Sequence, residues 1–293
     1  MEIKLIPTHK YRTTVVFFDD DKTFLEFVES HINLDKYNFR FVTNYDEFIE
    51  IFNTSESIKK TIPSILVKID DELRDSEQHE AFDFDFSKFA EIHALPNKDQ
   101  EISLAFIDND LGNLNGIQIC TELKTDTKKI LLTGTSDFKG ALMAMSEKHI
   151  ANYVPKVEAP DNLSNNEDLV VRLNRIIEHF TDEYFREKDY YKNKLLVDGE
   201  FKRLLKHIVD KYNITEYSMF GKDSLLLIDN FKNKKILKCW IKSDFEQYYI
   251  DHYDDLDQDK NNLLTEVKEL FRFPINSLLV ESMRYEHLYY CIY

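Results

Sequence analysis

The sequence has 293 residues, of which 43% are hydrophobic and 13% aromatic, so it can form the cores of two ordinary domains. It carries 38 Lys and Arg against 54 Asp and Glu, and this balance disfavours non-specific binding to nucleic acid, which depends on basic residues. There is no apolar stretch of membrane-spanning or signal-peptide length, so we expect a cytoplasmic protein. Three cysteines without metal-ligand spacing predict neither a disulfide framework nor a zinc site.

Short apolar runs separated by segments of helical periodicity fill the first part of the chain. The runs lie at 14–18, 37–42, 103–107, 129–132 and 152–155. Strands that are apolar throughout, rather than alternating, are typical of a parallel sheet covered by helices on both faces. The pattern therefore predicts a doubly wound α/β domain with a five-stranded parallel sheet.

The rest of the chain suggests three further parts. Residues from about 54 to 102 far exceed the loop that a compact α/β unit needs, and so predict an insertion. Beyond residue 166, apolar residues at three- and four-residue steps predict a long helix. A different pattern after residue 200 predicts a helix and several strands. We therefore predict a domain at 1–160, a connector helix at 161–197, and a small α+β domain of unknown type at 198–293.

Acidic residues follow two of the predicted strands. Asp19 and Asp20 come directly after the first run, and Asp108 and Asp110 come after the third. The carboxyl ends of parallel strands meet at one edge of a sheet, so we expect these carboxylates to converge. Carboxylates about 4 Å apart repel each other, so such a cluster keeps protons or holds a cation. A ligand set made only of oxygen favours Mg²⁺.

The two remaining strand ends supply different chemical groups. Thr133 follows the fourth run and offers a hydroxyl, and Lys156 follows the fifth and offers an ammonium. A nucleophilic carboxylate, a metal, a hydroxyl and an ammonium can together bind a phosphoryl group and stabilise its in-line transfer. The combination predicts a site for phosphoryl chemistry.

Four segments resemble the receiver domains of bacterial two-component response regulators. They are FFDDDKTFLEF (17–27), AFIDNDLGNLNGIQI (105–119), ILLTGTSD (130–137) and ANYVPK (151–156). The resemblance implies a flavodoxin-like fold in which Asp108 accepts the phosphoryl group. It makes Asp19, Asp20, Asp108 and the backbone carbonyl of Asp110 the Mg²⁺ ligands. It also makes Thr133 and Lys156 catalytic partners and pairs Thr133 with Tyr153 as the conformational switch, with Gly116 as the tight-turn glycine.

The same resemblance implies a place in a phosphorelay. The phosphoryl group would come from a sensor histidine kinase or a phosphotransfer protein, and the chain itself would catalyse at most its own dephosphorylation. The expected consequence is homodimerisation and control of an output that does not bind DNA, acting on an unknown protein or ligand. The family commonly has proline directly after the lysine, whereas here Pro155 precedes Lys156 and Val157 follows it.

Two alternatives remain open from the sequence. In the first, the domain resembles a receiver but takes no phosphate and serves as an interaction module. In the second, Asp19, Asp21 and Thr23 form the DxDxT opening of haloacid-dehalogenase-type phosphatases, with Asp19 as the nucleophile. The identity of the phosphorylated aspartate distinguishes these hypotheses.

Overall fold

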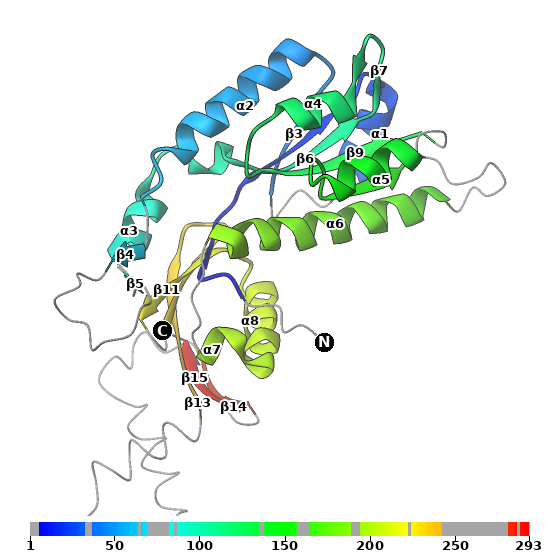
Figure 1. The fold of residues 1–293 in the computed structure, drawn as a ribbon. Helices are drawn as coiled ribbons and strands as arrows, with labels where there is room; N and C mark the ends of the chain where they lie inside the picture. The colour runs from blue at the N-terminus through cyan, green and yellow to red at the C-terminus, as the bar shows by residue number, and fades with distance from the viewer. Residues whose placement is uncertain are drawn as a thin grey trace, which may run out of the picture. The chain divides into compact units, whose positions relative to one another are not determined.

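The computed structural model describes residues 6–32, 37–63, 66–68, 82–84, 87–134, 138–156, 165–188, 194–221, 224–241, 281–285 and 288–292. The chain forms two compact units, and neither is continuous in sequence (Figure 1). The α/β unit comprises Tyr11–Ser64 and Ala90–Lys188. The composite unit comprises Met1–Lys10, Ile65–Phe89 and Asp189–Tyr293. The chain therefore passes between the units four times.

The α/β unit is built on a five-stranded sheet in which every pairing is parallel. In sheet order its strands are β10 (Asn152–Pro155), β9 (Lys128–Thr133), β6 (Ile102–Asp108), β2 (Thr14–Phe18) and β3 (Asn38–Val42). If the five strands are numbered by their appearance in this unit and the sheet is read from β3 to β10, the order is 2-1-3-4-5, which is that of flavodoxin-like folds. The predicted doubly wound parallel sheet is thus confirmed. Its direction of winding reverses between β2 and β6, where such folds bind ligands.

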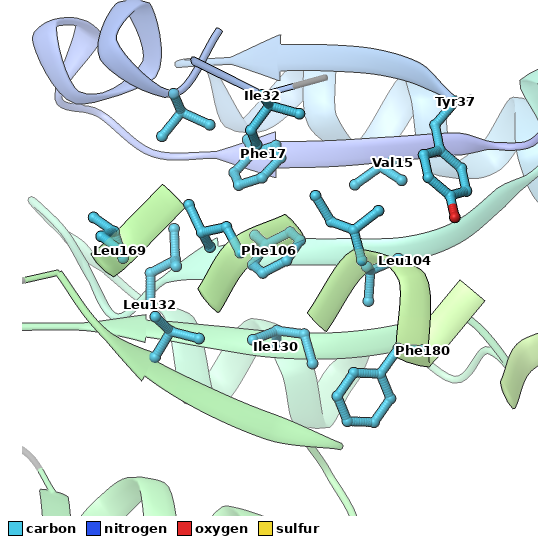
Figure 2. Packing of buried hydrophobic residues seen from close by; sticks show 14 of the residues in the cluster. Val15, Phe17, Ile32, Tyr37, Leu104, Phe106, Ile130, Leu132, Leu169 and Phe180 are labelled. Atoms are coloured by element: carbon cyan, nitrogen blue, oxygen red, sulfur yellow. The ribbon is translucent and has the colours of Figure 1, made fainter. Parts of the chain in front are cut away.

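Helices cover both faces of this sheet. On one face, α1 (Lys22–His31) and α6 (Asn165–Lys188) pack their apolar side chains against the strands. Figure 2 shows Phe17 and Phe106 at the centre of this layer, with Leu169 and Phe180 from α6 close by. The other face is covered by α2 (Tyr45–Lys59), α4 (Gly116–Glu122) and α5 (Phe138–Ser146). With both faces buried, only the ends of the strands are available for polar chemistry.

The predicted connector helix lies largely within this layer. α6 has 24 residues, and its buried stripe of Leu169, Leu173 and Ile177 continues to Tyr184 and Phe185. These side chains pack against the sheet of the α/β unit, so they are not available to pack against the same helix of a second copy of the chain. A further short helix, α7 (Lys194–Val197), follows in the composite unit.

A buried carboxyl group closes the amino-terminal edge of the sheet. Glu101, directly before β6, has no exposed surface and accepts hydrogen bonds from the hydroxyls of Tyr11 and Tyr184. Its backbone oxygen also accepts from the amide of Thr14 at 2.8 Å. Three segments distant in sequence, the start of β2, the start of β6 and the end of α6, are joined at this point.

The predicted insertion starts after α2, which continues to Lys59. It contains the antiparallel pair β4 (Leu66–Lys68) and β5 (Phe82–Phe84), then α3 (Ser87–Ala94) and a 3-10 turn (Lys98–Gln100). The insertion ends where β6 begins at Ile102. Its middle part, Ile65–Phe89, belongs to the composite unit.

The composite unit has a six-stranded antiparallel sheet and helix α8 (Gly199–Lys211), as expected for an α+β domain. In order, the strands are β1 (His9–Lys10), β11 (Ile214–Gly221), β12 (Ser224–Asp229), β13 (Lys234–Ile241), β15 (Leu288–Ile292) and β14 (Glu281–Tyr285). The first residues belong to this unit and not to the predicted domain at 1–160, because His9 in β1 pairs with Ser218 in β11. Long-range pairing, rather than position in the sequence, determines which unit this strand joins.

Candidate functional site

Three carboxylates converge at the carboxyl ends of β2 and β6. Asp19 follows β2 and Asp108 ends β6, and both are buried, whereas the neighbouring Asp20 is exposed. One carboxylate oxygen from each lies within 4.8 Å of the others. The switch point of the sheet thus brings together Asp19, Asp20 and Asp108, whereas Asp110, the fourth acid of that prediction, is exposed and is not part of this cluster.

Lys156 forms ion pairs with both buried carboxylates. Its ammonium lies 2.7 Å from Asp19 Oδ2 and 2.9 Å from Asp108 Oδ1. The backbone fixes this position, because Pro155 is the last residue of β10 and the amide of Lys156 donates to the carbonyl of Thr133 at 2.8 Å. The lysine therefore reaches the acids with proline before it rather than after it.

An aromatic ring from α1 completes the surroundings of Lys156. The ammonium lies 5.0 Å from the centre of the Phe24 ring, a distance at which the electron-rich face attracts a cation. Phe24 is partly buried and packs against the core between α1 and the sheet. Phe24 is not among the predicted site residues; it lies in the first turn of α1, three residues after the N-cap Asp21.

The site favours uptake of positive charge. Burial raises the pKa of Asp19 to about 6, with Lys156 opposing the rise and Asp108 adding to it. Burial also raises the pKa of Asp108, and the ion pair with Lys156 partly offsets this. For Lys156, burial alone would lower the pKa, but the two aspartates outweigh it and raise the pKa above its usual value. Two closely spaced carboxylates sharing one ammonium still carry excess negative charge.

The donor set fits a magnesium ion. Mg²⁺ requires oxygen ligands, uses few carboxylates and keeps several waters. Two buried carboxylates and the exposed Asp20 meet this description, since the exposed side of the cluster leaves room for water. Asp110, whose backbone carbonyl is the predicted additional ligand, lies two residues beyond Asp108, at the start of the short strand β7 (Asp110–Leu111).

The loop after Asp108 is a small hairpin closed by a glycine contact. β7 pairs with β8 (Leu114–Asn115), and Gly112 between them has a positive φ of 67°. Gly116 begins α4, and a Cβ built on it would lie 2.1 Å from the backbone oxygen of Asp108. Only glycine allows α4 to start this close to the end of β6.

The two predicted switch residues lie on neighbouring strands. Thr133 is buried at the end of β9, where it pairs with Pro155. Tyr153 is partly buried in β10 and packs against the core on the α5 side of the sheet. Thr133 thus occupies the same carboxyl-terminal edge as Asp108. The switching roles of both residues remain predictions.

One contact disfavours the phosphatase alternative. The side chain of Asp21, the second acid of the DxD pattern, caps α1 by accepting from the amides of Thr23 and Phe24. A carboxylate that accepts from two backbone amides at a helix start serves as an N-cap. Asp21 therefore has a structural task where the phosphatase mechanism needs an acid.

Comparison with solved structures agrees with this geometry. The response regulator LqsR of Legionella pneumophila aligns over 98% of this chain and 88% of its own, with a TM-score of 0.65 and 19% sequence identity. The chain has the fold of a response regulator. Receiver domains from Methanospirillum hungatei (18% identity, 60% of this chain, 98% of that chain, TM-score 0.34) and Clostridium thermocellum (17%, 56%, 98%, 0.32) also match. No protein-family model and no curated protein matches the sequence.

The likeness to the fold of LqsR extends over the composite unit as well as the α/β unit. Among the described residues, no helix is long and apolar enough to cross a membrane.

Proposed function

We propose that the chain is a response regulator whose Asp108 accepts a phosphoryl group in the presence of Mg²⁺. The observation that carries the proposal is the arrangement around Asp108: a buried carboxylate, two further acids with oxygens within 4.8 Å, and an ammonium 2.9 Å away. If each carboxylate had its own cation, the cluster would be a set of simple ion pairs. Here three carboxylates share one ammonium, that of Lys156. The excess supports a cation site beside a nucleophile.

The proposed chemistry is a phosphoryl transfer between two groups. A carboxylate oxygen of Asp108 attacks the phosphorus of a phosphohistidine, the phosphorus–nitrogen bond breaks, and the imidazole leaves and takes up a proton. Asp19, Asp20, Asp108 and the carbonyl of Asp110 would hold Mg²⁺, which supplies neutralising charge to the phosphoryl oxygens. Lys156 would release one carboxylate and pair with a phosphoryl oxygen instead. Thr133 would donate its hydroxyl to another.

The donor and the consequence follow from this chemistry. A sensor histidine kinase or a phosphotransfer protein would supply the phosphohistidine. Reorientation of Thr133 toward the acyl phosphate would let Tyr153 move inward, and the composite unit would serve as the output, acting through a protein partner or through homodimerisation. Homodimerisation could use the α/β unit, because α5 carries three exposed apolar side chains: Leu142, Met143 and Met145.

The test is intact-protein mass spectrometry after incubation with acetyl phosphate and Mg²⁺. The wild type should gain the mass of one phosphoryl group, and Asp108→Asn should gain none. Asp110→Asn is the matched control, because it changes an exposed carboxylate two residues away and leaves the backbone carbonyl in place. Chelation of Mg²⁺ should also abolish the gain.

Other outcomes would identify the alternatives. A mass gain that persists in Asp108→Asn and disappears in Asp19→Asn would favour the phosphatase-type nucleophile. No gain in the wild type, with either acetyl phosphate or a phosphorylated donor protein, would favour a receiver that acts without phosphate.

A further inference from the structure

The ammonium of Lys156 stands at the end of a long, flexible side chain. The backbone of Lys156 is held by β10 and by the carbonyl of Thr133, but four methylene groups separate the charge from it. Of the three N–H donors of an ammonium, two have carboxylate partners here, Asp19 Oδ2 and Asp108 Oδ1. Both carboxylates are expected ligands of Mg²⁺, and Asp108 is also the proposed nucleophile. The two contacts that hold the ammonium are therefore the ones that change during the proposed reaction.

Phe24 offers the ammonium a contact that does not depend on these carboxylates. The centre of its ring lies 5.0 Å from Lys156 Nζ, within the range of a cation–π interaction. A hydrocarbon ring is neither a ligand for Mg²⁺ nor a partner for a phosphoryl oxygen, so neither competes for it. The side chain of Lys156 is only 17% exposed, and cation–π attraction is strongest where the cation is shielded from water.

The position of the ring is fixed by the acids of the same site. Asp19 Oδ1 accepts from the amide of Asp21 at 3.0 Å, and Asp21 Oδ1 accepts from the amide of Phe24 at 3.2 Å. Lys156 closes this circuit of contacts, since it pairs with Asp19 Oδ2 and meets the Phe24 ring. The ring also packs against the core between α1 and the sheet. It therefore has a defined place beside the ammonium, set by the first turn of α1.

We propose that Phe24 is a positioning residue for Lys156, whose ring keeps the ammonium in the site while the lysine exchanges a carboxylate for a phosphoryl oxygen. This inference rests on the proposed function, because it gives the ring a part in the same transfer. Phe24 touches neither the metal nor the phosphoryl group and acts only through Lys156. A lysine that is already in place loses less conformational freedom on the way to the transition state, so the ring should affect the rate of transfer.

The rate of phosphoryl uptake from acetyl phosphate and Mg²⁺, followed by mass spectrometry of the intact full chain, tests the proposal. Phe24→Leu keeps an apolar side chain but removes the ring face, and should slow uptake about threefold. Phe24→Tyr keeps a ring face and should keep the wild-type rate. In the Lys156→Gln background there is no charge for the ring to attract, so adding Phe24→Leu should have no further effect.

Phe27→Leu is the matched control. Phe27 lies on the same helix, is partly buried like Phe24 and packs against the same core, but its ring lies beside His31, with 4.5 Å between the ring centroids. The substitution removes the same atoms from α1 as Phe24→Leu does and should leave the rate of uptake unchanged. It therefore separates a loss of packing from the loss of the ring beside Lys156.

Three results would overturn the proposal: a wild-type rate in Phe24→Leu, equal slowing by Phe27→Leu, or slowing that persists in full in the Lys156→Gln background. If that background takes up too little phosphate to measure, urea denaturation of the metal-free protein provides the same cycle. Non-additive losses for Phe24→Leu and Lys156→Gln support the pairing of ring and ammonium, and additive losses overturn it. A wild type that takes up no phosphoryl group contradicts the proposed function, and the urea cycle still decides on the pairing.

Discussion

Two aspartates at strand ends, one in each unit, have opposite environments. Asp19 follows β2 in the α/β unit, and its pKa is raised to about 6 by burial and by Asp108, despite Lys156. Asp229 ends β12 in the composite unit; burial alone would raise its pKa, but donors from Asn233, Phe231 and Lys235 lower it instead. A carboxylate surrounded by donors from its own turn is structural. A carboxylate that lies beside other carboxylates, as Asp19 does, has negative charge that is not fully compensated and can attract a cationic ligand.

The largest expected effect concerns the space around the acceptor. Gly116→Ala would place a methyl group against the backbone oxygen of Asp108, which cannot move without displacing β6. We expect a loss of about 3 kcal/mol in the free energy of unfolding and a failure to take up phosphate. Gly199→Ala, at the start of α8 in the composite unit, meets nothing within 4 Å and should be neutral or stabilising by up to about 1 kcal/mol. Urea denaturation of both variants measures the difference.

A smaller effect is expected at Glu101, another buried carboxyl group. Glu101 resembles Asp229 in having dedicated donors, but they are the hydroxyls of Tyr11 and Tyr184, which are remote in sequence. Tyr184→Phe should lower the free energy of unfolding by about 2 kcal/mol, because a fully buried acceptor loses a partner. A Tyr11→Phe and Tyr184→Phe double variant should depart from additivity. Additive losses of a few tenths of a kcal/mol would show that the two hydroxyls do not act together.

The same substitution at the two strand-end aspartates should have opposite signs. Because its native pKa is raised, metal-free Asp19 holds its proton more tightly in the folded state, and its contribution to stability falls as pH rises from about 4 to about 6. Asp19→Asn should therefore raise the free energy of unfolding by about 1–2 kcal/mol near pH 8, and give no gain near pH 4.

Asp229 provides the contrast. Its pKa is lowered, so its contribution is present above its unfolded pKa and is lost as pH falls through the folded value. Asp229→Asn should destabilise the protein at neutral pH. Thermal melts with and without Mg²⁺ complete the comparison, since Mg²⁺ should stabilise the wild type and Asp229→Asn but not Asp19→Asn. Equal shifts in both variants would remove the distinction between the two environments.

The smallest effect concerns the rings beside the lysines. Phe24→Leu should slow phosphoryl uptake from acetyl phosphate about threefold, because Lys156 loses an attractive ring face, and Phe24→Tyr should restore the rate. Tyr212→Leu removes the ring beside Lys235 in the composite unit and should not change uptake. Stopped-flow measurement of the rate of phosphoryl uptake compares the Phe24→Leu and Tyr212→Leu variants.

Local patterns predicted much of the α/β unit. The apolar runs predicted its five strands, and the strand ends located the acids and Lys156. Features that depend on contacts distant in sequence were not predictable. These include the hydroxyls around Glu101, the ring of Phe24 over Lys156, and the pairing of β1. No periodicity within one segment carries information about a partner elsewhere in the chain.

The pairing of His9 in β1 with Ser218 in β11 has a consequence during protein synthesis. At translation rates of about 5–20 residues per second, β1 leaves the ribosome about 10–40 s before its partner strand exists. During that interval the α/β unit can be completed, because its last helix ends at Lys188. The nascent chain can therefore complete its α/β unit before β1 has a partner strand to pair with.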